Sequence, residues 1–157
     1  MVATDRDLQL WIGEVKFYNN ITRAIRDVVA ELEAHMKRDY LRAEFAAITN
    51  KIEPTWPHAD RLKSLLHRNR PLQTIFDAVC IPVLLTYDSP TIAAHTNVTE
   101  TFRSAFEEEM LRHHASFAAK PLPPNVRIHL FLFPLKSKAE LMRQFDSRLK
   151  ALQGLVP

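Results

Sequence analysis

The stretch that decides the fold of this chain is LQLWIGEVKFY, residues 8–18. Apolar side chains recur at every second position through Leu8, Leu10 and Ile12, which predicts a β-strand over residues 8–17. In this register Glu14 and Lys16 fall on the same side of the strand, because side chains two residues apart leave the same face. The strand therefore carries two charged side chains in an otherwise apolar setting.

A charged pair on such a strand costs free energy unless a ligand, a metal or a partner satisfies it. Phosphodiester cleavage would explain such a pair. A carboxylate holds a divalent metal that activates water, and a neighbouring lysine stabilises the negative charge that develops on the phosphate. We expect Glu14 and Lys16 to be catalytic, with Glu14 as the metal ligand. A solvated or decayed pair stays open as an alternative, because Glu-x-Lys triplets arise by chance.

The residues that follow this strand predict one long helix and then a buried strand. The helix is expected from about Asn20 to Thr49, on an apolar stripe at helical spacing formed by Ile21, Ile25, Val28, Leu32, Met36, Ala43 and Ala47. A short helix over residues 60–68 is stopped by Pro71. The apolar run 78–87 predicts a strand covered on both faces, and Pro82 inside it requires a bulge or an edge position.

The rest of the chain continues the alternation of helix and strand. Asn97 and Glu100 are spaced as a capping box for a helix that runs to residue 119, and residues 126–135 predict another strand. Ser137 and Glu140 open a last helix, whose apolar stripe is Leu141, Phe145, Leu149 and Leu152. This order predicts a single α/β domain over residues 1–157, with a mixed sheet flanked by helices in a three-layer core.

Composition excludes several classes of protein. Only Gly13 and Gly154 are glycines, so glycine-rich phosphate loops of the Walker or dinucleotide type are excluded. One cysteine, Cys80, excludes an internal disulfide and a four-cysteine zinc site; it is expected to be buried and inert. The net charge of +3 permits nucleic-acid binding without requiring it. Without an apolar span or a signal peptide, we expect a cytoplasmic protein that does not engage a membrane.

Some further residues are weaker candidates for a functional site. Asn20 and Arg23 begin the helix after the motif and could contact a DNA phosphate, although a solvated flank is the simpler interpretation. Asp88 ends the buried strand, where ligands bind in open α/β sheets, but a turn-forming role is favoured. Glu109 and His113 are four residues apart and could share a metal; a solvated helix face is favoured instead.

A basic set on the predicted short helix and directly after it could touch a DNA backbone, with a solvated loop-flanking helix about equally favoured: Arg61, Lys63, His67, Arg68 and Arg70.

The quoted strand and the residues after it resemble a known family. LWIGEVKFY, followed by NITRAI, resembles the PD-(D/E)xK motif of HamA-like proteins, the nuclease component of Hachiman anti-phage defence. The resemblance continues through IPVLLTYDS and IHLFLFPLKSKAELMRQFDSRLKAL and so covers nearly the whole chain. It implies a restriction-endonuclease-like fold, DNA cleavage that depends on Mg²⁺ or Mn²⁺, and a helicase subunit as partner.

The chain departs from the family pattern at one point. The motif requires an aspartate on the preceding strand, and only Asp5 and Asp7 precede Glu14. An extended chain advances about 3.3 Å per residue, which would leave Asp7 roughly 20 Å from Glu14. Thr4 to Asp7 instead predicts a hairpin turn. We therefore expect an N-terminally shortened, inactive nuclease without its first strands; the alternative is a non-catalytic remnant or interaction module that binds the helicase.

Overall fold

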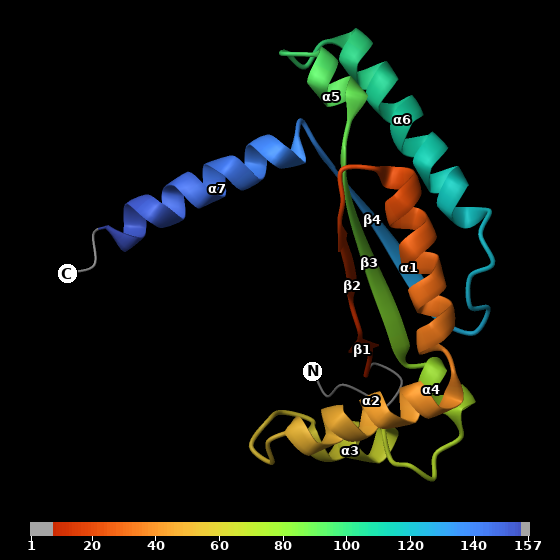
Figure 1. Cartoon of the computed structure of the whole chain (residues 1–157). Helices are drawn as coiled ribbons and strands as arrows, with labels where there is room; N and C mark the ends of the chain where they lie inside the picture. The colour runs from red at the N-terminus through yellow and green to blue at the C-terminus, as the bar shows by residue number, and fades with distance from the viewer. Residues whose placement is uncertain (1–7, 155–157) are drawn as a thin grey trace. The chain divides into compact units, whose positions relative to one another are not determined.

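Helices and strands alternate along the chain in the computed structural model, which describes residues 8–154, without the side chains of residues 38 and 39 (Figure 1). The strands are β1 (Leu10–Trp11), β2 (Glu14–Phe17), β3 (Val79–Asp88) and β4 (Arg127–Leu135). The helices are α1 (Ile21–His35), α2 (Arg38–Lys51), α3 (Ala59–Leu65), α4 (Leu72–Phe76), α5 (Pro90–Ala94), α6 (Glu100–Ala118) and α7 (Lys138–Gln153).

The four described strands form one sheet around β3. β1 pairs with β3 in parallel, with Leu10 opposite Val79 and Trp11 opposite Cys80, and β3 also pairs with β2 and with β4. Helices flank this sheet, which confirms the predicted α/β class and is consistent with a three-layer core. The predicted hairpin turn at Thr4–Asp7 lies outside the described residues.

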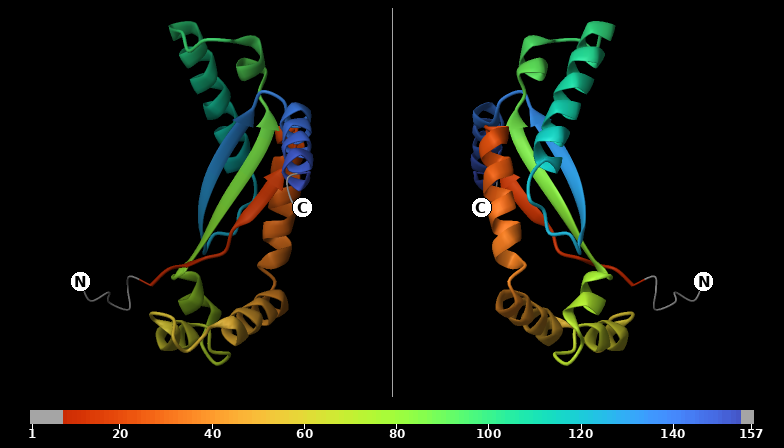
Figure 2. Two further views of the ribbon diagram at one scale, coloured as in Figure 1. Left: turned by 90° about the vertical axis from the view of Figure 1, so that its left-hand side faces the viewer. Right: turned by 90° about the vertical axis from the view of Figure 1, so that its right-hand side faces the viewer.

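The chain divides into two compact units. The first contains Met1–Glu14, Asp27–Val83 and Lys120–Leu130, and the second contains Val15–Arg26, Leu84–Ala119 and Phe131–Pro157. Helices α2, α3 and α4 belong to the first unit, where the two views of Figure 2 agree that α2 and α3 lie side by side. Helices α5, α6 and α7 belong to the second. The expectation of a single domain stays a prediction.

The predicted long helix is wrong, because the chain breaks at Met36 and Lys37 between α1 and α2. On α1 the expected residues Val28 and Leu32 are buried, but on α2 the buried residues are Leu41 and Phe45. Leu41 follows Leu32 by nine positions, which at about 100° per residue is half a turn out of phase. One straight helix could not bury both the α1 residues and the α2 residues. The break therefore lets α2 turn a different face to the core. The predicted core positions Ala43 and Ala47 are exposed.

Pro82 lies within β3, which is not an edge strand because β1, β2 and β4 all pair with it. Of the two expected arrangements, the edge position is therefore wrong, and the bulge stays a prediction. The strand predicted over residues 8–17 is instead two short strands, and they are separated at Ile12 and Gly13. A Cβ built on Gly13 would lie 3.5 Å from Cγ of Pro82, so the interruption lies beside the proline. A proline has no N–H to donate to a ladder, which accounts for the gap.

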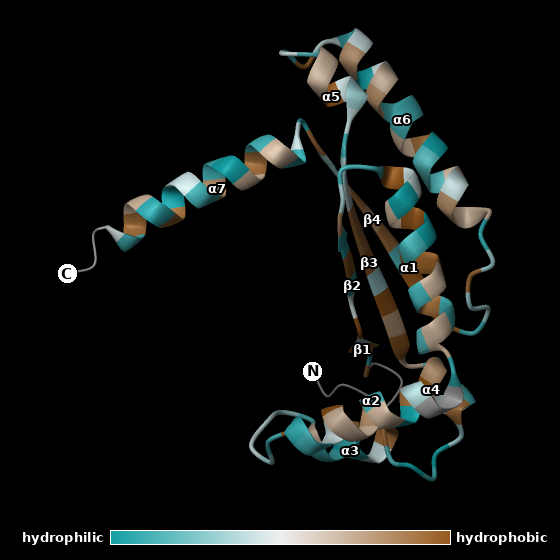
Figure 3. Ribbon diagram, in the orientation of Figure 1, coloured by the Kyte–Doolittle hydropathy of each residue, from teal (hydrophilic) through white to brown (hydrophobic). Residues whose placement is uncertain are grey.

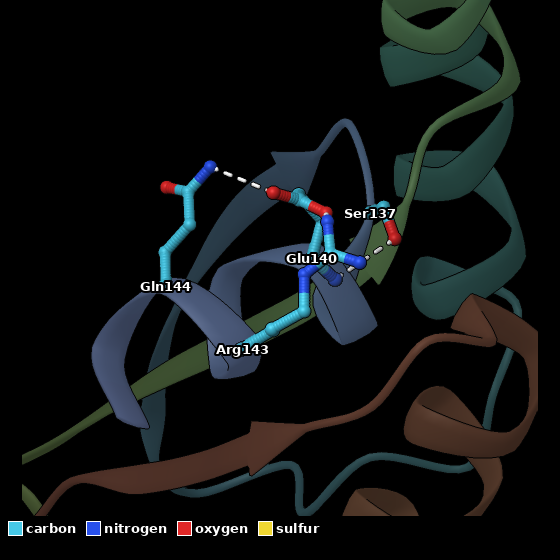
Figure 4. Close-up of polar contacts among 4 residues, drawn as sticks. All are labelled: Ser137, Glu140, Arg143 and Gln144. Carbon is cyan, nitrogen blue, oxygen red and sulfur yellow. Dashed lines mark hydrogen bonds and ion pairs between the residues drawn. The ribbon is translucent and has the colours of Figure 1, made fainter. Parts of the chain in front are cut away.

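Side-chain caps start the helices of the second unit. Thr99, rather than the predicted Asn97, caps α6, because its side chain accepts a hydrogen bond from the N–H of Phe102 at 3.2 Å. Ser137 caps α7 as predicted, accepting from the N–H of Glu140 at 3.2 Å (Figure 4). Glu140 in turn accepts from Gln144 at 2.9 Å and pairs with Arg143. The five-residue helices α4 and α5 were not predicted.

Helix α7 carries the predicted apolar stripe but buries none of its residues. Phe145, Leu149 and Leu152 are 53%, 57% and 61% exposed. Apolar and polar residues alternate along this helix in Figure 3. The stripe was correctly located in the sequence, but in the second unit it does not contribute to the core.

Candidate functional site

Glu14 begins β2 and is held by a histidine. Along β2, half-buried Glu14 and Lys16 alternate with exposed Val15 and Phe17, as the two-residue period predicts. The side chain of Glu14 is 16% exposed, and its Oε1 lies 2.7 Å from Nδ1 of His35. The imidazole therefore fixes the orientation of a carboxylate that is mostly withdrawn from solvent.

His35 reaches Glu14 because strand and helix have matching lengths. From Glu14 to the start of α1 the extended chain advances about 3.3 Å per residue, or roughly 20 Å in total. The 15 residues of α1 return over a similar length, since a helix rises about 1.5 Å per residue. The last residue of α1, His35, thus comes back beside the first residue of β2.

A cavity of about 210 Å³ adjoins Glu14 within the first unit. Its polar lining comes from Glu14, His35, Tyr40 and Glu44, and its remaining walls are mostly apolar, formed by Ile12, Gly13, Leu32, Met36, Leu41, Phe76, Val79 and Ile81. The rings of His35 and Tyr40 are stacked, with centroids 4.4 Å apart and an interplanar angle of 5°. Helix α2 thus supplies both a tyrosine and a second carboxylate to the cavity that Glu14 lines.

The electrostatics around Tyr40 show that carboxylates concentrate here. Partial burial and then the negative charges of Glu44, Glu14 and Glu31 raise the pKa of the Tyr40 hydroxyl. Each of these carboxylates opposes formation of a phenolate, since like charges disfavour ionisation. The same negative potential favours a bound cation.

Carboxylates near a cavity do not by themselves form a metal centre. Among the side chains that the structure describes, which exclude those of residues 38 and 39, no group of three or more His, Cys, Asp or Glu is arranged to hold a metal ion. Magnesium prefers near-octahedral oxygen coordination and is usually held by one or two carboxylates together with substrate and water. The described lining of the cavity supplies two carboxylates toward such a site, Glu14 and Glu44.

Comparison with known protein families tests the resemblance that the motif suggested. The model of the HamA family matches residues 1–149 of the 157 in the chain. The chain belongs to the HamA family. Membership indicates a role in Hachiman anti-phage defence. Searches of the curated proteins and of the solved structures found no match.

The other motif residue of this HamA chain, Lys16, is half-buried on β2. Its backbone carbonyl accepts a hydrogen bond from Oγ1 of Thr86 at 3.4 Å, within the second unit. A common role for Glu14 and Lys16 stays a prediction, supported by their alternation on one strand. None of the helices in the described part of the chain is long and apolar enough to cross a membrane.

Asn20 and Arg23 have local structural roles. Oδ1 of Asn20 accepts a hydrogen bond from the N–H of Arg23 at 2.9 Å, which satisfies a free donor in the first turn of α1. The guanidinium of Arg23 lies 5.2 Å from the ring centroid of Tyr18. Contact of either residue with DNA stays a prediction.

Asp88 helps to start α7, because its Oδ1 accepts from the N–H of Lys138 at 2.6 Å.

Glu109 overturns the expectation of a solvated helix face. It is 0% exposed, and its Oε1 accepts a hydrogen bond from the Tyr87 hydroxyl at 2.7 Å. Its Oε2 accepts from the N–H of Thr91 at 3.2 Å, and the ring of His113 meets Tyr87 edge-on at 4.9 Å. A carboxylate on α6 is buried because the end of β3 and the start of α5 supply its donors, which helical spacing alone could not reveal.

Sequence reasoning missed His35 and Tyr40 as companions of Glu14. No short motif links residues 14, 35 and 40, because they meet through a helix that returns along a strand. One signal was available: a titratable residue at the end of a helix whose length matches the preceding extended segment. This signal can be used only when the end of α1 is known. The prediction of one uninterrupted helix over residues 20–49 gave the wrong end.

Proposed function

We propose that this HamA chain contributes the catalytic strand of a metal-dependent DNA nuclease in anti-phage defence. The observation that supports the proposal is the position of Glu14, mostly withdrawn from solvent beside a cavity and held by His35 at 2.7 Å. A carboxylate held in one orientation beside a cavity is suited to bind a cation there.

The proposed roles follow from the chemistry of each side chain. Glu14 is the metal ligand, and His35 is a positioning residue that orients it by hydrogen bonding. Lys16 stabilises negative charge that develops on the phosphate. The cofactor would be Mg²⁺ or Mn²⁺, and Glu44, which lines the same cavity as Glu14, could supply a second carboxylate beside substrate oxygens and water. A helicase subunit of the same defence system is the proposed partner.

A second function is a non-catalytic module that only binds the helicase partner. The exposed apolar stripe of α7 favours this alternative. It differs from the nuclease in one consequence: Glu14 and Lys16 would then be dispensable for defence.

Phage infection of cells that carry the gene in its natural locus separates the two functions. A nuclease predicts that Glu14→Ala and Lys16→Ala each abolish protection, measured as the efficiency of phage plating. Lys136→Ala, a change at an exposed residue outside the motif, is the matched control and should leave protection intact. Full protection by Glu14→Ala at equal protein abundance would favour the interaction module.

A further inference from the structure

We propose that the segment joining α3 to α4 binds the phosphate backbone of DNA, at a surface apart from the Glu14 cavity. The surface, here named the basic loop, consists of Lys63 near the end of α3 together with His67, Arg68, Asn69 and Arg70 in the segment that follows. Apart from Arg68, these residues line a hollow of about 560 Å³ together with Ser64 and Pro71. This inference goes beyond the proposed nuclease centre, because it concerns binding alone and requires no metal and no cleavage.

The charge of this segment is of one sign. Residues 61–70, RLKSLLHRNR, contain Arg61, Lys63, Arg68 and Arg70 and no acidic residue, whereas the whole chain has 21 basic and 18 acidic side chains. Residues 67–70 are all exposed. Lys63 and Arg68 have no ion-pair or hydrogen-bond partner for their side chains within residues 8–154. Their charges are therefore not neutralised by the described part of the chain.

Hydrogen bonds from Arg42 of α2 fix the shape of the basic loop. The guanidinium of Arg42 donates hydrogen bonds to the carbonyl oxygens of Arg68 at 2.7 Å and Arg70 at 2.9 Å. Arg70 donates from Nε to the carbonyl of Ser64 and from Nη2 to its Oγ, both at 3.2 Å. The N–H of Arg70 also bonds to the carbonyl of His67 at 2.9 Å. These hydrogen bonds fix the shape of the loop, although its positively charged side chains repel one another.

A preformed loop binds at lower entropic cost than a flexible one, since fewer groups must be ordered. Its donors suit phosphate oxygens: lysine as a point charge, arginine as a planar fork, and the side-chain amide of Asn69. The exposed residues 67–70, with half-buried Lys63 beside the same hollow, suit an extended polyanion, because phosphate contacts are sequence-independent and add along the backbone.

Helix α2 links this surface to the motif glutamate within the first unit. Arg42 holds the basic loop, while Tyr40, Leu41 and Glu44 of the same helix line the Glu14 cavity. DNA bound at the basic loop would thus be held by the same small group of helices that forms the wall of the cavity.

The test measures binding of a labelled DNA duplex by fluorescence anisotropy, with EDTA present so that cleavage cannot contribute. The double variant Lys63→Ala/Arg68→Ala should bind at least about tenfold more weakly near 0.1 M salt. Its slope of log affinity against log salt should be smaller by about two, since each lost phosphate contact removes about one counterion. The loss should be the same for unrelated DNA sequences.

Arg112→Ala/Lys120→Ala is the matched control, because it also lowers the net charge from +3 to +1 and changes two exposed residues elsewhere. It should keep the parent's salt slope. The exchange Lys63→Arg/Arg68→Lys keeps both charges and should bind like the parent. Equal weakening in the control, or an unchanged salt slope in the alanine variant, would overturn the proposal.

The outcome is independent of the nuclease proposal. A chain that binds DNA through the basic loop but never cleaves it supports the loop and contradicts the nuclease. If the chain still cleaves DNA and keeps its affinity for DNA after Lys63 and Arg68 are both replaced, the result supports the nuclease and contradicts the basic loop.

Discussion

Glu109 shows at the scale of one residue what a buried charge requires. It is fully buried, yet within residues 8–154 no buried side-chain nitrogen or oxygen lacks a hydrogen-bond partner. Donors from Tyr87 and Thr91 replace the water that the carboxylate loses on folding. If one of these donors is removed, the carboxylate still bears the free-energy cost of its burial. Each donor therefore contributes to the stability of the second unit.

Tyr87→Phe tests this directly. The change removes one hydroxyl and leaves Oε1 of Glu109 without its donor at 2.7 Å. We expect the free energy of unfolding to fall by about 1.5–3 kcal/mol, the usual value for a hydrogen bond to a charged group. Urea unfolding at neutral pH measures it. Tyr18→Phe, on a half-buried tyrosine, is the control and should change stability far less.

The same carboxylate should make stability depend on pH. Burial alone would raise the pKa of Glu109, but hydrogen bonds from Thr91, Tyr87 and Ser89 outweigh it and hold that pKa below its usual 4.5. A carboxyl whose pKa is lower in the folded state stabilises the fold above its unfolded pKa and loses that contribution as the pH falls.

Glu109→Gln keeps the size of the side chain but cannot titrate. The gap in unfolding free energy between the parent and this variant should be largest above pH 4.5 and shrink as the solution is acidified. Burial also lowers the pKa of His113, and the negative charge of Glu109, present only in the parent, partly opposes that shift. A gap that stays constant from pH 7 to pH 3 would mean that the pKa of Glu109 is the same in the folded and the unfolded chain, and a gap that grows on acidification would mean that it is raised in the fold.

At the scale of elements, alternation and helical spacing located most of the structure. The period of two placed Glu14 and Lys16 on the same side of β2, and the continuous apolar run correctly predicted that β3 is buried. The break after His35 was missed because Met36 and Ala43 continue the apolar spacing while the buried face changes to Leu41 and Phe45. Local spacing could not show that change, since it depends on what each helix packs against.

Val28→Asp tests the packing of α1. Val28 is 0% exposed, so aspartate would bury a charge without a partner. We expect a loss of several kcal/mol, roughly 3–5, seen as a large drop in melting temperature. Ala30→Asp, on the exposed side of the same helix, should cost about 0.5 kcal/mol. Similar melting temperatures for Val28→Asp and the parent would rule the packing out.

At the scale of the whole molecule, the family could be recognised from sequence, but the environment of the motif could not. The HamA relationship rested on LWIGEVKFY and the C-terminal stretch, which a single sequence displays fully. The contacts of Glu14 with His35, and of Glu109 with Tyr87, join residues 21 and 22 positions apart. Such pairs depend on how helices return to the sheet, which spacing rules do not specify.

The central claim is that Glu14 is a catalytic metal ligand, and nicking of supercoiled plasmid DNA tests it most directly. The 157-residue chain alone should cleave poorly with Mg²⁺, because one well-placed carboxylate positions the metal weakly. Beside the proposed helicase partner, the chain should nick plasmid with Mg²⁺ but not with EDTA. Glu14→Ala should reduce that rate by about 10²-fold or more. Equal cleavage by Glu14→Ala, or no Mg²⁺-dependent cleavage beside the helicase partner, would contradict the account.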